Sequence, residues 1–381
     1  MRIVLVFSHN VSLETWASAG ILNREVSIYR RIAEEGVEVV FVTYGDETDY
    51  HWQNMWRGIT IVPLFAGRRK FRSKVLLWLH SLLLAYRVRL VVPHPDLIKT
   101  NQIVGGLVAV QMKMMWQEPL LVRCGYDPYQ FALNGKLNSM KSLLIRWYSY
   151  IVYRSADRIH VASERDATFV RRRYSLRKNC DIEVRPNWVD TALFKAPVGG
   201  RVEPMQDRVL AIGRAVDQKN FQLMIEAIGL GPYGIDIISD DDGSVSLEET
   251  AKQFSADVRI LARVPHQDLP TVYCCYPIYL ITSRFEGHPK SLLEAMACAR
   301  AVVGTRVPGI EQVIDDEQTG LLVEETPTAV QKAIHRLMSD VALREQLGRA
   351  AREEIRQKFS LDDAVSQELE AYRNLVDRDM H

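Results

Sequence analysis

Short apolar runs alternate with helix-like segments along almost the whole chain, and this alternation limits the fold more than any other feature. The run at 2–8 is followed by a segment, 23–36, whose apolar residues recur at helical spacing and which ends at Gly36. Further strand-like runs in the first half are VEVVFVTY (37–44), RLVVPH (89–94), PLLVRCG (119–125) and RIHVAS (158–163). Strands that alternate with helices predict an α/β fold built on a parallel, doubly wound sheet.

The alternation stops at residues 186–206, where three prolines, a Gly pair and no periodicity indicate a linker between domains. It then restarts, with strand-like or helix-like segments at RVLAIGR (208–214), NFQLMIEAIG (220–229), GIDIIS (234–239), DVRILAR (257–263), YPIYLIT (276–282), RAVVGTR (300–306) and GLLVE (320–324). The length of 381 residues also favours two domains. We predict a first domain over 1–188, a linker over 189–206 and a second domain over 207–360. Two α/β domains in tandem would enclose a crevice at the carboxyl ends of their sheets, where such sheets bind ligands.

Charge is distributed unevenly between the two halves. Of the 48 Lys/Arg and 47 Asp/Glu, residues 1–200 contain 28 and 17, so the first half carries +11 and the remainder −10. This asymmetry predicts two domains with different partners, although uneven surface composition could produce it as well. Five cysteines, an odd number with one adjacent pair, fit a reduced cytoplasmic setting. We expect no membrane span and no signal peptide, because the apolar runs are too short.

The stretch RFEGHPKSLLEAMA (284–297) places two carboxylates eight positions apart around the start of a helix. Pro289 suits the first turn of that helix, whose free backbone N–H groups from Gly287 to about Ser291 would form an anion site. Glu286 precedes this site and Glu294 follows it. A loop acid for sugar hydroxyls, amides for phosphate and a helix acid for ribose hydroxyls would match the linear order of a nucleotide sugar.

A second stretch, AIGRAVDQKNF (211–221), places Arg214 at the end of a strand and Lys219 near the start of a helix. Two cations across a strand-to-helix loop can converge on a diphosphate. Taken alone they could equally be ordinary surface charges. Together with the Glu pair of the same domain, they indicate a ligand site.

These segments together resemble the retaining glycosyltransferases of family 4, whose GT-B fold has two facing Rossmann-like domains and a deep cleft between them. The resemblance covers nearly the whole second half of the chain. Its motifs are Glu286 and Glu294 at E-x7-E spacing, Arg214 and Lys219 at R-x4-K spacing, RPNWVDTALF (185–194), RVPHQDLPTVY (263–273), VPGIEQVIDDEQTGLLV (307–323) and FSLDDAVSQELEAYRNL (359–375).

The resemblance implies a role for each matching residue. Glu286 would contact the donor sugar, Glu294 would hold the ribose, and Arg214 and Lys219 would neutralise the departing diphosphate, with Arg214, Lys219 and Glu286 as the catalytic set. The implied donor-binding residues are Gly213, Arg214, Lys219, Val264, Glu286, Gly287, His288, Pro289, Ser291, Leu292 and Glu294. The resemblance implies no metal, because Arg214 and Lys219 would do the job that a metal does elsewhere, and no cofactor, because the nucleotide-diphosphate sugar is a co-substrate. It also implies that the leaving phosphate helps to deprotonate the acceptor, so that no carboxylate nucleophile is needed. The last helix, within 361–381, would cross back onto the first domain.

The first half departs from the family pattern on the acceptor side. Where family members often have a Gly-Gly turn after the first strand, this chain has only Gly20. Where a histidine often follows a middle strand, the sequence offers Arg123, Tyr126 or Asp127 instead. The resemblance implies a hydroxyl acceptor on a growing glycan or a lipid-linked saccharide. Two other functions stay open, a catalytically silent nucleotide-sugar-binding protein and a sugar-nucleotide epimerase of the same fold.

Two cationic, apolar segments of the first half could serve a second purpose. Residues 67–90 begin with five cations and continue as an apolar run, so the segment could lie on an anionic membrane surface or face the core. For 136–154 we expect a buried interdomain helix. The pattern G-x-G-x-x-G at 229–234 follows a helix and precedes a strand, the reverse of a dinucleotide fingerprint, and indicates a turn. We find no zinc spacing and no nucleic-acid module.

Overall fold

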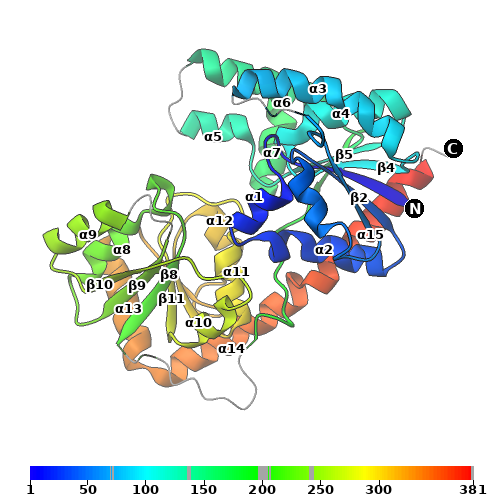
Figure 1. Cartoon of the computed structure of the whole chain (residues 1–381). Coiled ribbons are helices and arrows are strands. Elements are labelled where there is room, and N and C mark those ends of the chain that lie inside the picture. The colour runs from blue at the N-terminus through cyan, green and yellow to red at the C-terminus, as the bar shows by residue number, and fades with distance from the viewer. Residues whose placement is uncertain are drawn as a thin grey trace. The chain divides into compact units, whose positions relative to one another are not determined.

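The structure is a computed structural model that describes residues 1–68, 70, 73–134, 139–195, 205, 207–239 and 244–378. The chain forms two compact units (Figure 1). The first unit consists of residues 1–186 and 364–381, and the second of residues 187–363. Both are α/β units with parallel sheets, as the alternation of the sequence predicts.

The first unit is built on a seven-stranded parallel sheet in the order β3-β2-β1-β4-β5-β6-β7. Its strands are β1 (Arg2–Val6), β2 (Glu38–Thr43), β3 (Ile59–Pro63), β4 (Leu97–Thr100), β5 (Leu120–Cys124), β6 (Arg158–Val161) and β7 (Asp181–Val184). The central strands are almost fully buried, which is why they read as continuous apolar runs rather than as an alternation of apolar and polar residues.

Helices cover both faces of this sheet. They are α1 (Leu13–Ser18), α2 (Leu22–Glu34), α3 (Lys74–Val91), α4 (Gly106–Trp116), α5 (Pro128–Asn134), α6 (Ser139–Ser155), α7 (Glu164–Arg173) and α15 (Leu361–Arg378), with 3-10 turns η1 (Glu47–Trp52) and η2 (Ile103–Gly105). The strand order runs one way from β1 to β3 and the other way from β4 to β7, so right-handed crossovers place α2 on one face and α3, α4 and α6 on the other. Helix α15 lies on the α2 face, because Lys99 of β4 contacts the rings of both Tyr29 and Tyr372.

The second unit has a six-stranded parallel sheet in the order β10-β9-β8-β11-β12-β13. Its strands are β8 (Arg208–Ile212), β9 (Gly234–Ile238), β10 (Val258–Leu261), β11 (Ile278–Ile281), β12 (Ala301–Thr305) and β13 (Leu321–Val323). Its helices are η3 (Asp217–Lys219), α8 (Phe221–Ile228), α9 (Ser244–Gln253), α10 (Leu269–Cys274), α11 (Lys290–Ala297), α12 (Pro308–Glu311), α13 (Pro327–Ser339) and α14 (Val341–Lys358). Two apolar clusters form its core, one including residues of α10, α11 and α14 and the other residues of α8 and α13.

The strand predicted at 89–94 is wrong. Helix α3 continues through Val91, and Leu90 and Val91 are 83% and 67% exposed. The strand of this region is β4, whose start is fixed where the Arg2 amide donates to Asp96 at 2.6 Å. A short apolar run at the end of an exposed helix has the same composition as a buried strand, so composition alone predicts the wrong element.

The segment predicted as a linker begins with core residues rather than an exposed tether. Val189 and Phe194 are 3% and 1% exposed and pack in the core of the second unit. Residues 196–204 and 240–242 lie outside the described residues. The glycine pattern at 229–234 is the turn between α8 and β9, as predicted.

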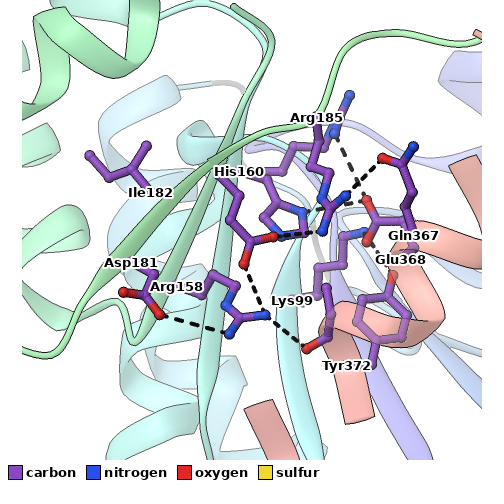
Figure 2. A network of polar contacts seen from close by, with 12 residues as sticks. Lys99, Arg158, His160, Asp181, Ile182, Arg185, Gln367, Glu368 and Tyr372 are labelled. Carbon is purple, nitrogen blue, oxygen red and sulfur yellow. Dashed lines mark hydrogen bonds and ion pairs between the residues drawn. The ribbon is translucent and has the colours of Figure 1, made fainter. Parts of the chain in front are cut away.

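Helix α15 is fastened to the first sheet by a buried polar network (Figure 2). Glu368 of α15 accepts a hydrogen bond from Lys99 Nζ at 2.7 Å, and Lys99 also donates to Tyr372 Oη at 2.7 Å. The other carboxylate oxygen lies 3.5 Å from His160 Nδ1 and 3.9 Å from Arg123 Nη1. These partners come from three adjacent strands, so one glutamate ties the last helix across β4, β5 and β6.

A second carboxylate continues the network at the sheet's edge. Glu183 of β7 lies 3.4 Å from His160 Nε2, 3.1 Å from Arg158 Nη1 and 2.7 Å from Arg185 Nη2. The close approach of His160, together with the two guanidinium charges, outweighs burial and lowers the pKa of Glu183 to about 2. Burial would raise the pKa of Glu368, but the charges of Lys99, His160 and Arg123 hold it well below its ordinary value. Both acids are therefore ionised partners of this network at neutral pH.

Candidate functional site

The candidate site of the second unit lies where the strand order reverses. From β8 the chain proceeds to β9 on one side, and from β11 to β12 on the other, so β8 and β11 are the neighbours at the switch point. Ligands of open α/β sheets bind outside the carboxyl ends of such strands. The segments that follow β8 and β11 contain Arg214 and Glu286, two of the residues predicted from the sequence.

The structure joins two of the predicted catalytic residues directly. Lys219 Nζ donates to Glu286 Oε1 at 2.6 Å, and Ser283 Oγ donates to the same oxygen at 2.7 Å. The side chains of Lys219 and Glu286 are 17% and 8% exposed. A carboxylate with two donors on one oxygen still has acceptor positions on the other, which a sugar hydroxyl could use.

Backbone contacts lock the two loops together. The side-chain amide of Gln218 donates to the backbone carbonyl of Phe285 at 3.0 Å, and the backbone amide of Arg284 donates to the backbone carbonyl of Gln218 at 2.9 Å. From the opposite side, Gly309 of α12 packs against the backbone of Glu286, so closely that an added Cβ would lie 2.2 Å from the Glu286 carbonyl oxygen. The position of Glu286 is thus set by three segments before any ligand binds.

The turn after Glu286 leads into the amino end of α11. Pro289 is the N-cap residue, and no side chain caps the first turn. The amide groups of Ser291 and Leu292 have no hydrogen-bond partner within the described part of the chain. Tyr279 donates to Ser291 Oγ at 2.8 Å, and the Asn187 side chain donates to the His288 carbonyl at 2.6 Å. These contacts hold the helix start in place and leave its amides free for an anion.

Glu294 lies one turn further along α11 and is only 4% exposed. Its carboxylate accepts a hydrogen bond from Tyr273 Oη at 3.0 Å and lies 3.2 Å from His266 Nε2. Burial and the neighbouring charge of Glu294 raise the pKa of Tyr273 well above its ordinary value, so its hydroxyl stays protonated and donates. Phe194 packs on the His266 ring with centroids 5.0 Å apart. A carboxylate has about four acceptor sites, so two remain for ribose hydroxyls.

The remaining predicted donor residues line the same edge. Arg214 is exposed, and its side chain forms no hydrogen bond or ion pair with any residue that the structure describes. Gly213 precedes it, and an added Cβ there would already touch the Lys219 side chain at 3.4 Å. Val264 is half-buried against the apolar cluster that contains α11. Within the described ranges, no group of three or more His, Cys, Asp or Glu side chains is placed to hold a metal ion.

The predicted acceptor-side residues all belong to the first unit. Gly20 ends the turn after α1 with φ +66°, a conformation that favours glycine. Arg123 faces Glu368 in the buried network. Tyr126, three positions after Arg123, is half-buried.

Asp127 has a structural position that leaves no room for an acceptor. It is 0% exposed, and it accepts hydrogen bonds from the amides of Tyr129 and Gln130 at 2.9 and 3.0 Å. The hydroxyls of Tyr153 and Tyr174 donate to it as well, at 2.9 and 3.3 Å. These contacts anchor the start of α5 to α6, and burial raises the pKa of Asp127. We therefore withdraw Asp127 as an acceptor-binding residue.

Comparisons with known proteins place both units in one family. The model described as "Glycosyltransferase Family 4" matches residues 25–193, and that described as "Glycosyl transferases group 1" matches residues 206–340. The chain belongs to the family 4 (group 1) glycosyltransferases. A curated family relative is N-acetyl-alpha-D-glucosaminyl L-malate synthase of Bacillus anthracis, 30% identical over 169 residues, which are 44% of this chain and 41% of the relative. The chain spans between 36% and 48% of the length of the first curated relatives it matches.

Solved structures of other proteins have the same fold as this chain. Sucrose-phosphate synthase from Thermosynechococcus elongatus superposes with a TM-score of 0.81 at 21% identity, covering 98% of this chain and 99% of the other. Anabaena HepE in complex with UDP-glucose superposes with a TM-score of 0.75 at 16% identity, covering 98% and 99%. The GT-B fold class predicted from the resemblance is confirmed in its two Rossmann-like parallel sheets.

Several residues that shape the candidate site are absent from the residues predicted for it. His266 and Tyr273 contact Glu294, while Ser283, Gln218 and Asn187 position Glu286 and the start of α11. His266 and Tyr273 lie within a motif that carries the resemblance, RVPHQDLPTVY, which was the available signal. Asn187 lies within the motif RPNWVDTALF and Gln218 within the stretch AIGRAVDQKNF, so the same signal was available for them. Ser283 is a polar residue after a strand, and nothing in its spacing distinguishes it from a surface residue.

Proposed function

We propose that the chain transfers a sugar from a nucleotide-diphosphate sugar to a hydroxyl acceptor, with retention of the anomeric configuration. The observation that carries the proposal is the contact of Lys219 with Glu286 at the switch point of the second sheet, beside the uncapped start of α11. Glu294 follows Lys290 by about 6 Å along the helix axis, at ~1.5 Å per residue. Glu286 would thus face the sugar, Lys219 and the free amides of α11 the diphosphate, and Glu294 the ribose.

In the proposed reaction the bond between the anomeric carbon and the phosphate oxygen breaks, and a bond to the acceptor oxygen forms on the same face. Lys219 and the exposed Arg214 would neutralise the negative charge that develops on the leaving diphosphate. The acceptor proton would pass to an oxygen of that phosphate, so no protein nucleophile is required. Glu286 would position the sugar through its hydroxyls.

Two comparisons support a nucleotide-diphosphate sugar as the donor. The Bacillus anthracis relative is named for a synthase of a glucosaminyl conjugate, and HepE was solved with UDP-glucose. UDP-sugars are therefore the first donors to test, followed by GDP- and ADP-sugars. For the acceptor we propose a glycan or a lipid-linked saccharide, used by a cytoplasmic protein that can associate with the inner membrane face.

The experiment is a panel of UDP-, GDP- and ADP-sugars in two assays, thermal unfolding and nucleotide release. A donor at about 100 times its Kd adds about 2.7 kcal/mol of stability, which raises Tm by several degrees. Lys219→Met should lower the rate of nucleotide release by about 10²–10³. The variant Lys332→Met, at an exposed lysine of α13, should leave this rate unchanged.

The outcomes separate the proposal from its rivals. Stabilisation by a donor without any nucleotide release would indicate a silent binding protein. A sugar of changed stereochemistry formed without acceptor would indicate an epimerase. Anomeric analysis of the product by NMR tests retention, and an inverted linkage would contradict the same-face step.

A further inference from the structure

The outward face of helix α3 carries an apolar stripe that none of the residues described by the structure covers. Leu76, Leu79, Leu83, Tyr86 and Leu90 follow one another at spacings of three and four residues, which places them on one side of a helix. They are 49%, 48%, 74%, 62% and 83% exposed. The opposite side of the helix packs inward through Leu84, Ala85 and Val88.

Helix α6 carries a second stripe of the same kind. Met140, Leu143, Leu144, Trp147 and Tyr150 are 72%, 61%, 64%, 61% and 40% exposed. The interior side of α6 presents Ser149, Val152 and Tyr153, which are fully buried. The prediction of a buried helix at 136–154 is therefore wrong, because only one of its sides is buried.

Both stripes belong to one layer of the first unit. Helix α4 packs against α3 and against α6, and all three connect strands in the same direction, so they cover the same face of the sheet (Figure 1). The packing of α4 on α6 is tight, since a Cβ added to Gly106 would meet the Val152 side chain at 2.4 Å. We call the outward residues of α3 and α6 the α3/α6 surface. It is held on a rigid layer and is not a loosely attached segment.

The charge of these two helices is entirely positive. Helices α3 and α6 contain six Lys/Arg and no Asp/Glu. Four of these cations, Arg87, Arg89, Lys141 and Arg146, are exposed along the stripes. A second copy of the chain would bring like charges together at this surface, which disfavours a dimer. Exposed leucines and tryptophan flanked only by cations match the interface of a bilayer that contains anionic lipid.

We propose that the α3/α6 surface docks the chain on a bilayer containing anionic phospholipid, with both helices lying in the plane of the interface. None of the helices in the described part of the chain is both long and apolar enough to cross a membrane. Leu83 and Trp147 would enter the headgroup boundary, and Arg87 and Arg146 would contact lipid phosphates. The inference rests on the first unit alone and does not depend on the proposed transfer reaction.

The test is co-sedimentation with vesicles of phosphatidylcholine alone and of phosphatidylcholine mixed with phosphatidylglycerol. We expect binding to the mixed vesicles, weakening with added salt. Each cation removed should lower the partition coefficient about fivefold, since a basic residue contributes about 1 kcal/mol at an anionic surface. Arg146→Gln tests this step, and the double variant Leu83→Glu/Trp147→Glu should abolish binding.

The matched control is Leu230→Glu, because Leu230 is 58% exposed but belongs to the second unit. It should bind mixed vesicles as the unchanged chain does, and circular dichroism should show that all variants are folded. Equal binding by the control and the double variant would overturn the proposal. So would failure to bind the mixed vesicles, or a dimer in analytical ultracentrifugation that the double variant abolishes, because a second copy would then cover this surface.

Discussion

Replacing Glu368 by glutamine should strongly destabilise the first unit. The carboxylate is 4% exposed and is the acceptor of Lys99 Nζ at 2.7 Å, with His160 and Arg123 within 4 Å of its other oxygen. Glutamine keeps the shape but removes the charge, so Lys99 and Arg123 lose their common counter-charge in a buried setting. Removing one partner of a buried ion pair costs about 3–5 kcal/mol. For a unit of this size that cost lowers Tm by about 10 °C.

The assay is thermal unfolding by calorimetry, with Glu370→Gln as the control. Glu370 lies on the same helix but is exposed, so its substitution should change the free energy of unfolding by less than about 0.5 kcal/mol. In the double variant Lys99→Met/Glu368→Leu both charges are absent, and stability should recover most of the loss. A loss below about 1 kcal/mol in Glu368→Gln would refute the reasoning, because it would mean that the network contributes no more than a surface pair.

The pH dependence has a definite sign. The folded-state pKa of Glu368 is lowered, mainly by Lys99 acting against burial, so its contribution is fully present above the unfolded pKa of about 4.3. That contribution is lost as pH falls further through the folded-state value. The difference in Tm between the unchanged chain and Glu368→Gln should therefore be constant from pH 6 to 8. It should become smaller below about pH 4, where the stabilising contribution of the Glu368 carboxylate is lost.

Three further predictions concern the second unit. Lys219→Met should lower kcat by about 10²–10³, because the cation acts on the leaving diphosphate; equal kcat values would contradict this role. Gly309→Val should weaken donor binding in calorimetric titration, because the valine side chain would displace the Glu286 backbone. An unchanged affinity would show that Gly309 does not position the loop that contains Glu286. Tyr276→Phe should lower the free energy of unfolding in urea by about 1–3 kcal/mol, because the buried Asp236 would lose the hydroxyl that donates to it at 2.6 Å. A change within error would show that Arg208 alone satisfies the Asp236 carboxylate.

The sequence predicts the strands well where burial is complete and less well where helices are exposed on one side. The runs at 119–125 and 158–163 became β5 and β6, because a central parallel strand is apolar on both faces. The run at 89–94 has the same composition but ends a helix whose apolar residues face outward. Composition alone cannot separate these cases, since exposure depends on what packs against the segment.

The residues predicted to bind the donor lie along one edge of the second sheet, whereas Asp127, predicted for the acceptor side, is fully buried. Glu286, Lys219 and Arg214 follow the two strands of the switch point, so strand prediction placed them at one edge. The role of Glu368 could not be found in this way, because its partner Lys99 lies 269 positions away and a lone lysine in a strand suggests exposure. Asp127 was misread for a related reason: an acid before a proline in a loop is compatible both with ligand binding and with capping a helix, and only the surrounding tyrosines decide.

The most direct test of the proposed function is a crystal structure of the chain with the nucleotide sugar that stabilises it most. The diphosphate should lie within hydrogen-bond distance of Lys219 Nζ and the Ser291 amide, with the sugar on Glu286 and the ribose on Glu294. Electron density for the donor at any other place, or a donor that leaves Glu286 and Glu294 without contact, would contradict the proposed donor site.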